Sequence, residues 1–107
     1  MNNPLDTEFS EKFVEYMKNR MEVSFYKYGP LKEAYPFKVD AIKSALTRIE
    51  KYKETGNGEF LVDAANFLMI ETMSPAHKNY HFEATDSDKS PGRNWWHGPK
   101  NKKRNDE

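Results

Sequence analysis

The sequence predicts an all-α fold, in which a three-helix core is followed by a mostly irregular C-terminal arm and a flexible tail. Apolar residues recur at three- and four-residue steps in three stretches, residues 9–28, 38–54 and 58–72. This spacing places them on one face of a helix. The pattern disappears after the Ser74-Pro75 pair, and proline ends helices because it lacks the backbone N–H. We therefore expect a helical bundle over residues 1–75.

Composition and charge exclude several classes of protein. Among 107 residues, 17 Lys and Arg balance 17 Asp and Glu, which removes any general attraction to nucleic acid or an anionic membrane. The chain has no cysteine, so disulfides, thiolate nucleophiles and zinc–thiolate sites are excluded. Neither a signal peptide nor a membrane span is recognisable. We expect a cytoplasmic protein without a membrane partner.

The first predicted helix, residues 9–28, carries an aromatic and methionine stripe. Thr7 or Ser10 is suited to cap its start, and Gly29-Pro30 ends it. A stripe with this spacing is typical of a core face, and the alternative is a surface on which bases or a ligand stack. Its members are Phe9, Phe13, Tyr16, Met17, Met21, Phe25 and Tyr28.

The other two predicted helices are joined by a very short connection. Residues 38–54 form an amphipathic pattern, and residues 58–72 are apolar on nearly all sides. The intervening Thr55-Gly56-Asn57-Gly58 reads as a C-cap and turn, so the two helices should be antiparallel neighbours. A helix that is apolar all round belongs at the centre of a fold.

A polar stripe interrupts this central helix. Glu59, Asp63 and Asn66 stand at i, i+4 and i+7, which puts them on one narrow face. Ionised carboxylates cannot be buried there unless they meet cations, hydrogen-bond donors, a metal ion or water. Two interpretations stay open: a structural rim or ion pair satisfied by Arg or Lys, and a ligand or metal site.

The remainder of the chain is predicted to be an arm and a tail. We expect residues 76–97 to dock on the bundle, in part through Tyr80 and Phe82, and residues 98–107 to be a flexible basic tail. Ser90-Pro91-Gly92-Arg93 is favoured as a plain surface turn, and the alternative is a turn that delivers Arg93 to an anion or to the acidic stripe. The Trp95-Trp96 pair beside basic residues favours docking, and nucleic acid could bind only through this tail.

One combination of motifs resembles a known family. Lys27-Tyr28-Gly29, a helix carrying Arg48, and the run from Glu59 through Asp63 to Asn66-Phe67 resemble small MazG-like, all-α nucleotide pyrophosphohydrolases and their phage-encoded relatives. The resemblance implies that Glu59 and Asp63 are metal ligands for Mg²⁺ and catalytic residues. It also implies oligomers and a nucleoside triphosphate as substrate.

Two functions follow from these observations. In the first, a phage-type MazG-like helical protein binds or hydrolyses nucleoside triphosphates with Mg²⁺. Asn66 would then orient the substrate, and Arg48, Lys27 or Arg93 would contact its phosphates. In the second, the chain is a non-enzymatic viral accessory or inhibitor protein that binds a host protein, because the family's second acidic pair has no counterpart in residues 40–54. In both cases we expect a homo-oligomer.

Overall fold

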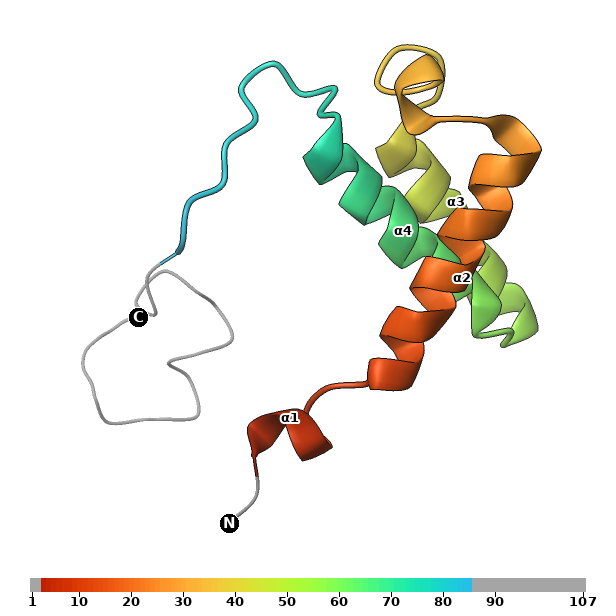
Figure 1. The fold of residues 1–107 in the computed structure, drawn as a ribbon, viewed down its shortest axis with the longest axis vertical. Coiled ribbons are helices and arrows are strands. Elements are labelled where there is room, and N and C mark those ends of the chain that lie inside the picture. The colour runs from red at the N-terminus through yellow and green to blue at the C-terminus, as the bar shows by residue number, and fades with distance from the viewer. Residues whose placement is uncertain (1–2, 86–107) are drawn as a thin grey trace.

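A computed structural model describes residues 3–85 of the chain, and all regular structure within them is helical (Figure 1). The described part contains four α-helices, a short 3₁₀ helix and no strand, so the predicted all-α class is confirmed. In chain order the elements are α1 (Pro4–Thr7), α2 (Glu11–Tyr28), η1 (Leu31–Glu33), α3 (Ala41–Thr55) and α4 (Glu59–Met73).

The helix ends follow from local capping chemistry. Helix α2 starts after Ser10, whose Oγ accepts a hydrogen bond from the Phe13 N–H at 2.9 Å. Helix α3 starts after Asp40, whose carboxylate accepts from the Lys43 N–H at 3.0 Å. Side-chain caps of this kind satisfy backbone donors that a helix start leaves without partners. Both helices therefore begin a few residues later than their apolar pattern predicts.

Helices α3 and α4 form the predicted antiparallel hairpin, which is the best-packed part of the molecule. Gly56 closes α3 in the left-handed conformation, with φ +74°, and its N–H donates to Tyr52 O at 2.7 Å. The buried residues between the two helices are small: Ala41 and Ala45 on α3, and Ala64 on α4. Small side chains let helices approach closely, which explains the tight hairpin.

Helix α2 lies across the hairpin and contacts mainly α4. The resulting core is thin, and Val62 and Ile70 are its largest buried apolar side chains. The expectation that α4 lies at the centre of the fold fails for one of its faces, because Leu61 remains 36% exposed and Leu68 49% exposed. The α3 and α2 contacts cover two sides of α4 and leave this third side uncovered.

The aromatic stripe of α2 contributes less to the core than predicted. Phe13, Met17 and Met21 are half-buried, because they lie on the side of α2 that meets α4. The expectation of burial is wrong for the other members, which are exposed: Phe9, Tyr16, Phe25 and Tyr28. The stripe is wide, and α2 contacts mainly one neighbouring helix, so only part of the stripe is covered.

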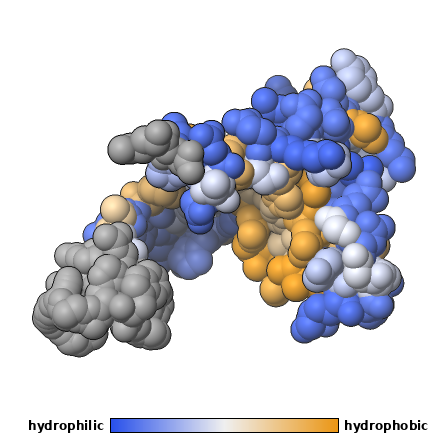
Figure 2. All heavy atoms as spheres, turned by 90° about the horizontal axis from the view of Figure 1, so that it is seen from below, coloured by the Kyte–Doolittle hydropathy of each residue, from blue (hydrophilic) through white to orange (hydrophobic). Residues whose placement is uncertain are grey.

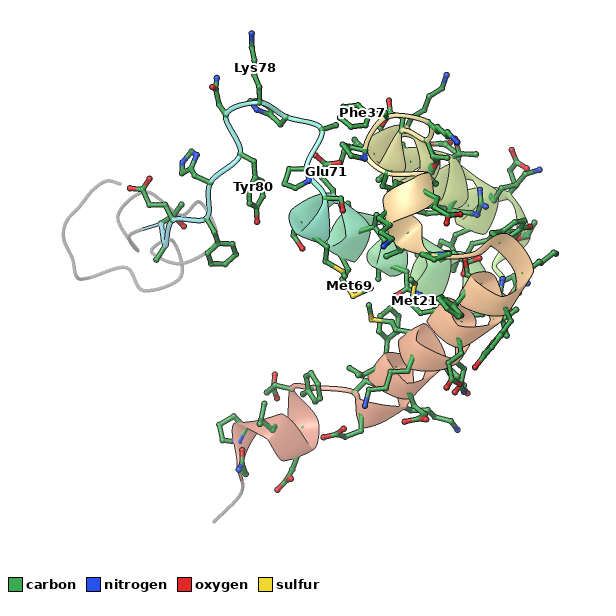
Figure 3. All side chains as sticks on the ribbon, turned by 45° about the horizontal axis from the view of Figure 1, so that its top comes forward. Met21, Phe37, Met69, Glu71, Lys78 and Tyr80 are labelled. Atoms are coloured by element: carbon green, nitrogen blue, oxygen red, sulfur yellow. The ribbon has the colours of Figure 1, made fainter. Side chains whose placement is uncertain are left out.

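The chain after α4 has no regular structure up to residue 85 and leads away from the helices (Figure 3). Phe82 is 89% exposed, and Tyr80 is also exposed, so the described part of the arm does not dock through Phe82. The predicted docking of residues 86–97, including Arg93 and the tryptophan pair, and the basic tail over 98–107 lie outside the described residues. No described helix is long and apolar enough to cross a membrane.

Candidate functional site

A cleft with a volume of about 250 Å³ opens between α2, η1, α3 and α4, and cations dominate its charged lining. Arg20 and Lys27 come from α2 and Arg48 from α3, against a single carboxylate, Asp63 of α4. We call this site the cationic cleft. Its full lining is Arg20, Met21, Val23, Ser24, Lys27, Tyr28, Leu31, Tyr35, Arg48, Asp63, Asn66, Phe67 and Ile70.

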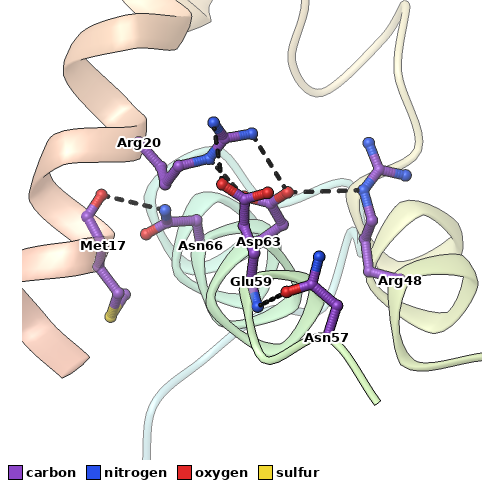
Figure 4. A network of polar contacts seen from close by, with 7 residues as sticks. All are labelled: Met17, Arg20, Arg48, Asn57, Glu59, Asp63 and Asn66. Carbon is purple, nitrogen blue, oxygen red and sulfur yellow. Dashed lines mark hydrogen bonds and ion pairs between the residues drawn. The ribbon is translucent and has the colours of Figure 1, made fainter. Parts of the chain in front are cut away.

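The two carboxylates of the polar stripe are held by arginines (Figure 4). Arg20 Nε donates to Asp63 Oδ1 at 3.2 Å, and Arg20 Nη2 donates to Asp63 Oδ2 at 3.5 Å. The same guanidinium reaches Glu59 Oε2 through Nη1 at 3.4 Å. Arg48 Nε lies 3.9 Å from Asp63 Oδ2 on the other side. Arg20 therefore bridges both carboxylates, and Asp63 sits between two arginines.

This network compensates the burial of the Asp63 carboxylate, whose side chain is only 17% exposed. The hydrogen bond to Asp63 raises the pKa of Arg20 above its ordinary value, while partial burial acts in the opposite direction. A bidentate guanidinium–carboxylate pair is among the strongest polar contacts in proteins. The structural ion-pair interpretation of the polar stripe is thus satisfied by Arg20 and Arg48.

Asn66 contributes an orphaned acceptor next to this network. It is 5% exposed, and its Nδ2 donates to Met17 O on α2 at 3.1 Å. That bond fixes the amide, and Oδ1 is left without a hydrogen-bond partner among the described residues. Buried carbonyl oxygens normally have a donor, so Asn66 offers an acceptor to a water or to a ligand group that carries N–H or O–H.

Aromatic rings accompany the cations of the cleft. The Arg48 guanidinium lies 5.3 Å from the centre of the Phe67 ring, and Lys27 Nζ lies at the same distance from the Tyr28 ring. Tyr35 follows η1, and its burial raises the pKa of the phenol, although nearby Arg48 opposes the shift. A cation over an aromatic face is attracted by the ring quadrupole, so these rings help to hold Arg48 and Lys27 at the cleft.

The described residues do not fit a Mg²⁺ ion held by the protein itself. Glu59 and Asp63 already share Arg20, and no group of three His, Asp or Glu side chains suited to a metal exists in residues 3–85. Mg²⁺ prefers near-octahedral oxygen ligands and gives up its waters reluctantly. Binding Mg²⁺ here stays a prediction, and no step of the function proposed below depends on it.

A second hollow lies between α2 and α4, on the other side of Arg20, and its volume is about 460 Å³. Apolar side chains make most of its wall, and Figure 2 shows that apolar residues gather in a hollow of the surface. We call it the apolar groove. Its lining is Phe13, Tyr16, Asn19, Arg20, Gly58, Glu59, Leu61 and Val62.

The structure brings together most of the site residues that the sequence predicts. Asn66, Arg48 and Lys27 line the cationic cleft together with Asp63, and Glu59 joins them through Arg20. Arg93 lies outside the described residues.

Sequence reasoning missed Arg20, which is the centre of the network. One signal for it exists, since Arg20, Ser24 and Lys27 stand at i, i+4 and i+7 on the first predicted helix. This spacing is the same as that of the polar stripe on α4.

Comparisons with protein-family models, curated proteins and solved structures find no match.

Proposed function

We propose that the cationic cleft binds the phosphate groups of a nucleoside triphosphate. The observation that carries this proposal is the convergence of Arg20, Lys27 and Arg48 from two helices on one small cleft with a single carboxylate in its lining. Arginine forks match phosphate oxygens in pairs, and lysine adds a mobile positive charge. A polyphosphate would neutralise the excess positive charge of the cleft.

The remainder of the cleft lining supports a nucleotide over a simple phosphate. Tyr28, Tyr35 and Phe67 give aromatic walls next to the cations, and a base can stack on such rings. Asn66 Oδ1 lacks a donor, and sugars and bases both carry N–H or O–H groups. The resemblance of the sequence to MazG-like nucleotide pyrophosphohydrolases supports the same class of ligand.

The proposal is binding, with hydrolysis left to experiment. Hydrolysis of a phosphoanhydride bond of a triphosphate needs a group that activates water, usually a carboxylate or a metal-bound water. The carboxylates at the cleft, Glu59 and Asp63, are both engaged by Arg20. They are therefore better placed to orient the arginines than to act as a base.

Thermal denaturation and calorimetry with a panel of nucleoside triphosphates test this proposal. We expect ligand binding to raise the melting temperature of the parent protein by linkage. Lys27→Gln should weaken binding, while Lys18→Gln, on the same helix but outside the cleft lining, should not. Release of pyrophosphate is followed in the same samples. The phosphate cleft is refuted if no triphosphate shifts the transition, or if the two lysine variants lose affinity equally.

The apolar groove favours a second candidate function, which is protein–protein interaction. We propose that its occupant is a second copy of the chain. Leu61, Ala65 and Leu68 stand at i, i+4 and i+7 on α4, so the exposed leucines form one stripe that continues the groove. Two identical stripes can pair about a two-fold axis. Pairing would bury apolar surface that the thin monomer core leaves exposed.

The oligomeric state tests this second candidate. Light scattering during size-exclusion chromatography should give a dimer or larger assembly for the parent protein. Leu61→Glu should shift it to the monomer because a charge would be buried in the contact. Leu5→Glu, which changes an exposed leucine of α1 outside the groove, serves as the control. A monomeric parent would leave a host protein as the remaining occupant.

A further inference from the structure

The place where a divalent cation would neutralise Glu59 and Asp63 is taken by a side chain. Arg20 contacts both carboxylates within 3.5 Å, through three of its nitrogen atoms. A second guanidinium, that of Arg48, faces Asp63 from α3. A metal ion bound to both carboxylates would compete with Arg20 for three of their four oxygen atoms, Asp63 Oδ1 and Oδ2 and Glu59 Oε2.

Arg20 also keeps donors for a ligand. A guanidinium has five N–H groups, and the contacts to Asp63 and Glu59 use one each from Nε, Nη1 and Nη2. The other two N–H groups are left for phosphate oxygens. Since Arg20 lines the cationic cleft, it can join the protein carboxylates to a bound phosphate as a bridging metal ion would.

From this arrangement we infer that the cleft binds polyphosphate without a divalent metal, with the Arg20 guanidinium acting as the bridging cation. The inference rests on the proposed phosphate binding and goes beyond it, because it states that the polyphosphate binds free of metal and not as its Mg²⁺ complex. Free polyphosphate carries more negative charge than its Mg²⁺ complex. Arg20, Lys27 and Arg48 should therefore attract the free form more strongly.

Calorimetry with inorganic tripolyphosphate, in buffer with EDTA and in buffer with Mg²⁺, tests the inference on the parent protein. We expect binding in EDTA that is as tight as, or tighter than, binding with Mg²⁺. Binding that requires Mg²⁺ would overturn the inference and leave the phosphate cleft standing. An absence of binding in both buffers would instead refute the phosphate cleft itself, and the inference with it.

Variants at position 20 provide a test of the bridging role. In EDTA, Arg20→Gln should weaken tripolyphosphate binding by about tenfold or more, which is the effect of losing one strong charge-assisted contact. Arg20→Lys should lose less, since it keeps the charge without the fork. Lys18→Gln is the charge-matched control on α2. Equal affinity of the parent and Arg20→Gln would contradict the bridging role.

A metal titration without phosphate gives a second readout that does not depend on ligand binding. Arg20→Gln leaves Glu59 and Asp63 one helical turn apart without their shared cation, so their repulsion should favour a divalent ion. We expect Mg²⁺ to raise the melting temperature of Arg20→Gln more than that of the parent. Equal shifts, or a larger shift in the parent, would show that Arg20 does not occupy the place of the ion.

Discussion

The cationic cleft and the apolar groove lie on opposite sides of Arg20 and share its side chain, yet they differ in size and chemistry. The cleft holds about 250 Å³ and collects three cations and a buried amide. The groove holds about 460 Å³ and is lined mostly by apolar side chains, with Glu59 at its edge. The smaller hollow suits a charged small molecule, and the wider one suits another protein surface.

The difference originates in how α2 and α3 pack against different sides of α4. Its buried side, with Val62 and Ile70, faces its neighbours and forms the floor of both hollows. Its polar stripe faces the arginines of α2 and α3, whereas its leucine stripe faces no described residue closely enough to be buried. One helix thus supports a polar site and a contact surface, each on a separate face.

The largest expected effect is a difference in unfolding free energy between truncations in the cleft and in the groove. Ile70→Ala removes a side chain that is 4% exposed and should cost about 2–5 kcal/mol of unfolding free energy. Leu61→Ala, in the groove, should cost about 1 kcal/mol because much of Leu61 is already solvated. Urea denaturation at low protein concentration measures both. Equal costs would mean that the groove is covered even at that concentration.

A smaller effect distinguishes the two carboxylates that Arg20 bridges. Asp63→Asn should destabilise the protein by about 1–3 kcal/mol, less than a fully buried pair would lose, because Arg20 and Arg48 remain partly solvated. Glu59→Gln should stay within about 0.5 kcal/mol, since Glu59 is more than half exposed and exposed ion pairs contribute little. If Glu59→Gln lost as much unfolding free energy as Asp63→Asn, the difference between a mostly buried carboxylate in the cleft and an exposed one in the groove would be contradicted.

The smallest expected effect is a change in alkaline stability. Burial raises the pKa of Tyr35 in the cleft, so the folded state favours the neutral phenol. This contribution is fully present below the ordinary tyrosine pKa of about 10 and is lost as the pH rises through the raised pKa. Tyr35→Phe should therefore flatten the fall in melting temperature at high pH. An equal fall in the melting temperature of the parent and of Tyr35→Phe would contradict this effect.

Much of the fold could be predicted because its signals are local. The periodic stretches gave three helices, and the tight turn at Gly56 gave the antiparallel hairpin that the structure contains. The exact helix starts depend on single caps at Ser10 and Asp40. Apolar periodicity alone cannot locate such caps, since it indicates which face of a helix is buried and not the residue at which the helix begins.

The candidate site was predictable only in part. The spacing of Glu59, Asp63 and Asn66 on one face was visible in the sequence, and so was the need of the carboxylates for a partner. The choice between a metal ion and an arginine was not, because Arg20 lies 43 residues before Asp63 in the chain. Ion-pair partners at that separation depend on the angle at which α2 crosses α4.

By itself, the sequence determined which segments are helical, which faces are apolar and where two carboxylates need compensation. These properties arise from contacts between residues a few positions apart. Only the tertiary structure decided that Arg20 meets both carboxylates, that Asn66 Oδ1 lacks a donor, and that Leu61 and Leu68 remain exposed. The physical reason is that one apolar or polar stripe can be satisfied by several neighbours, and only helix packing selects which neighbour lies within contact distance.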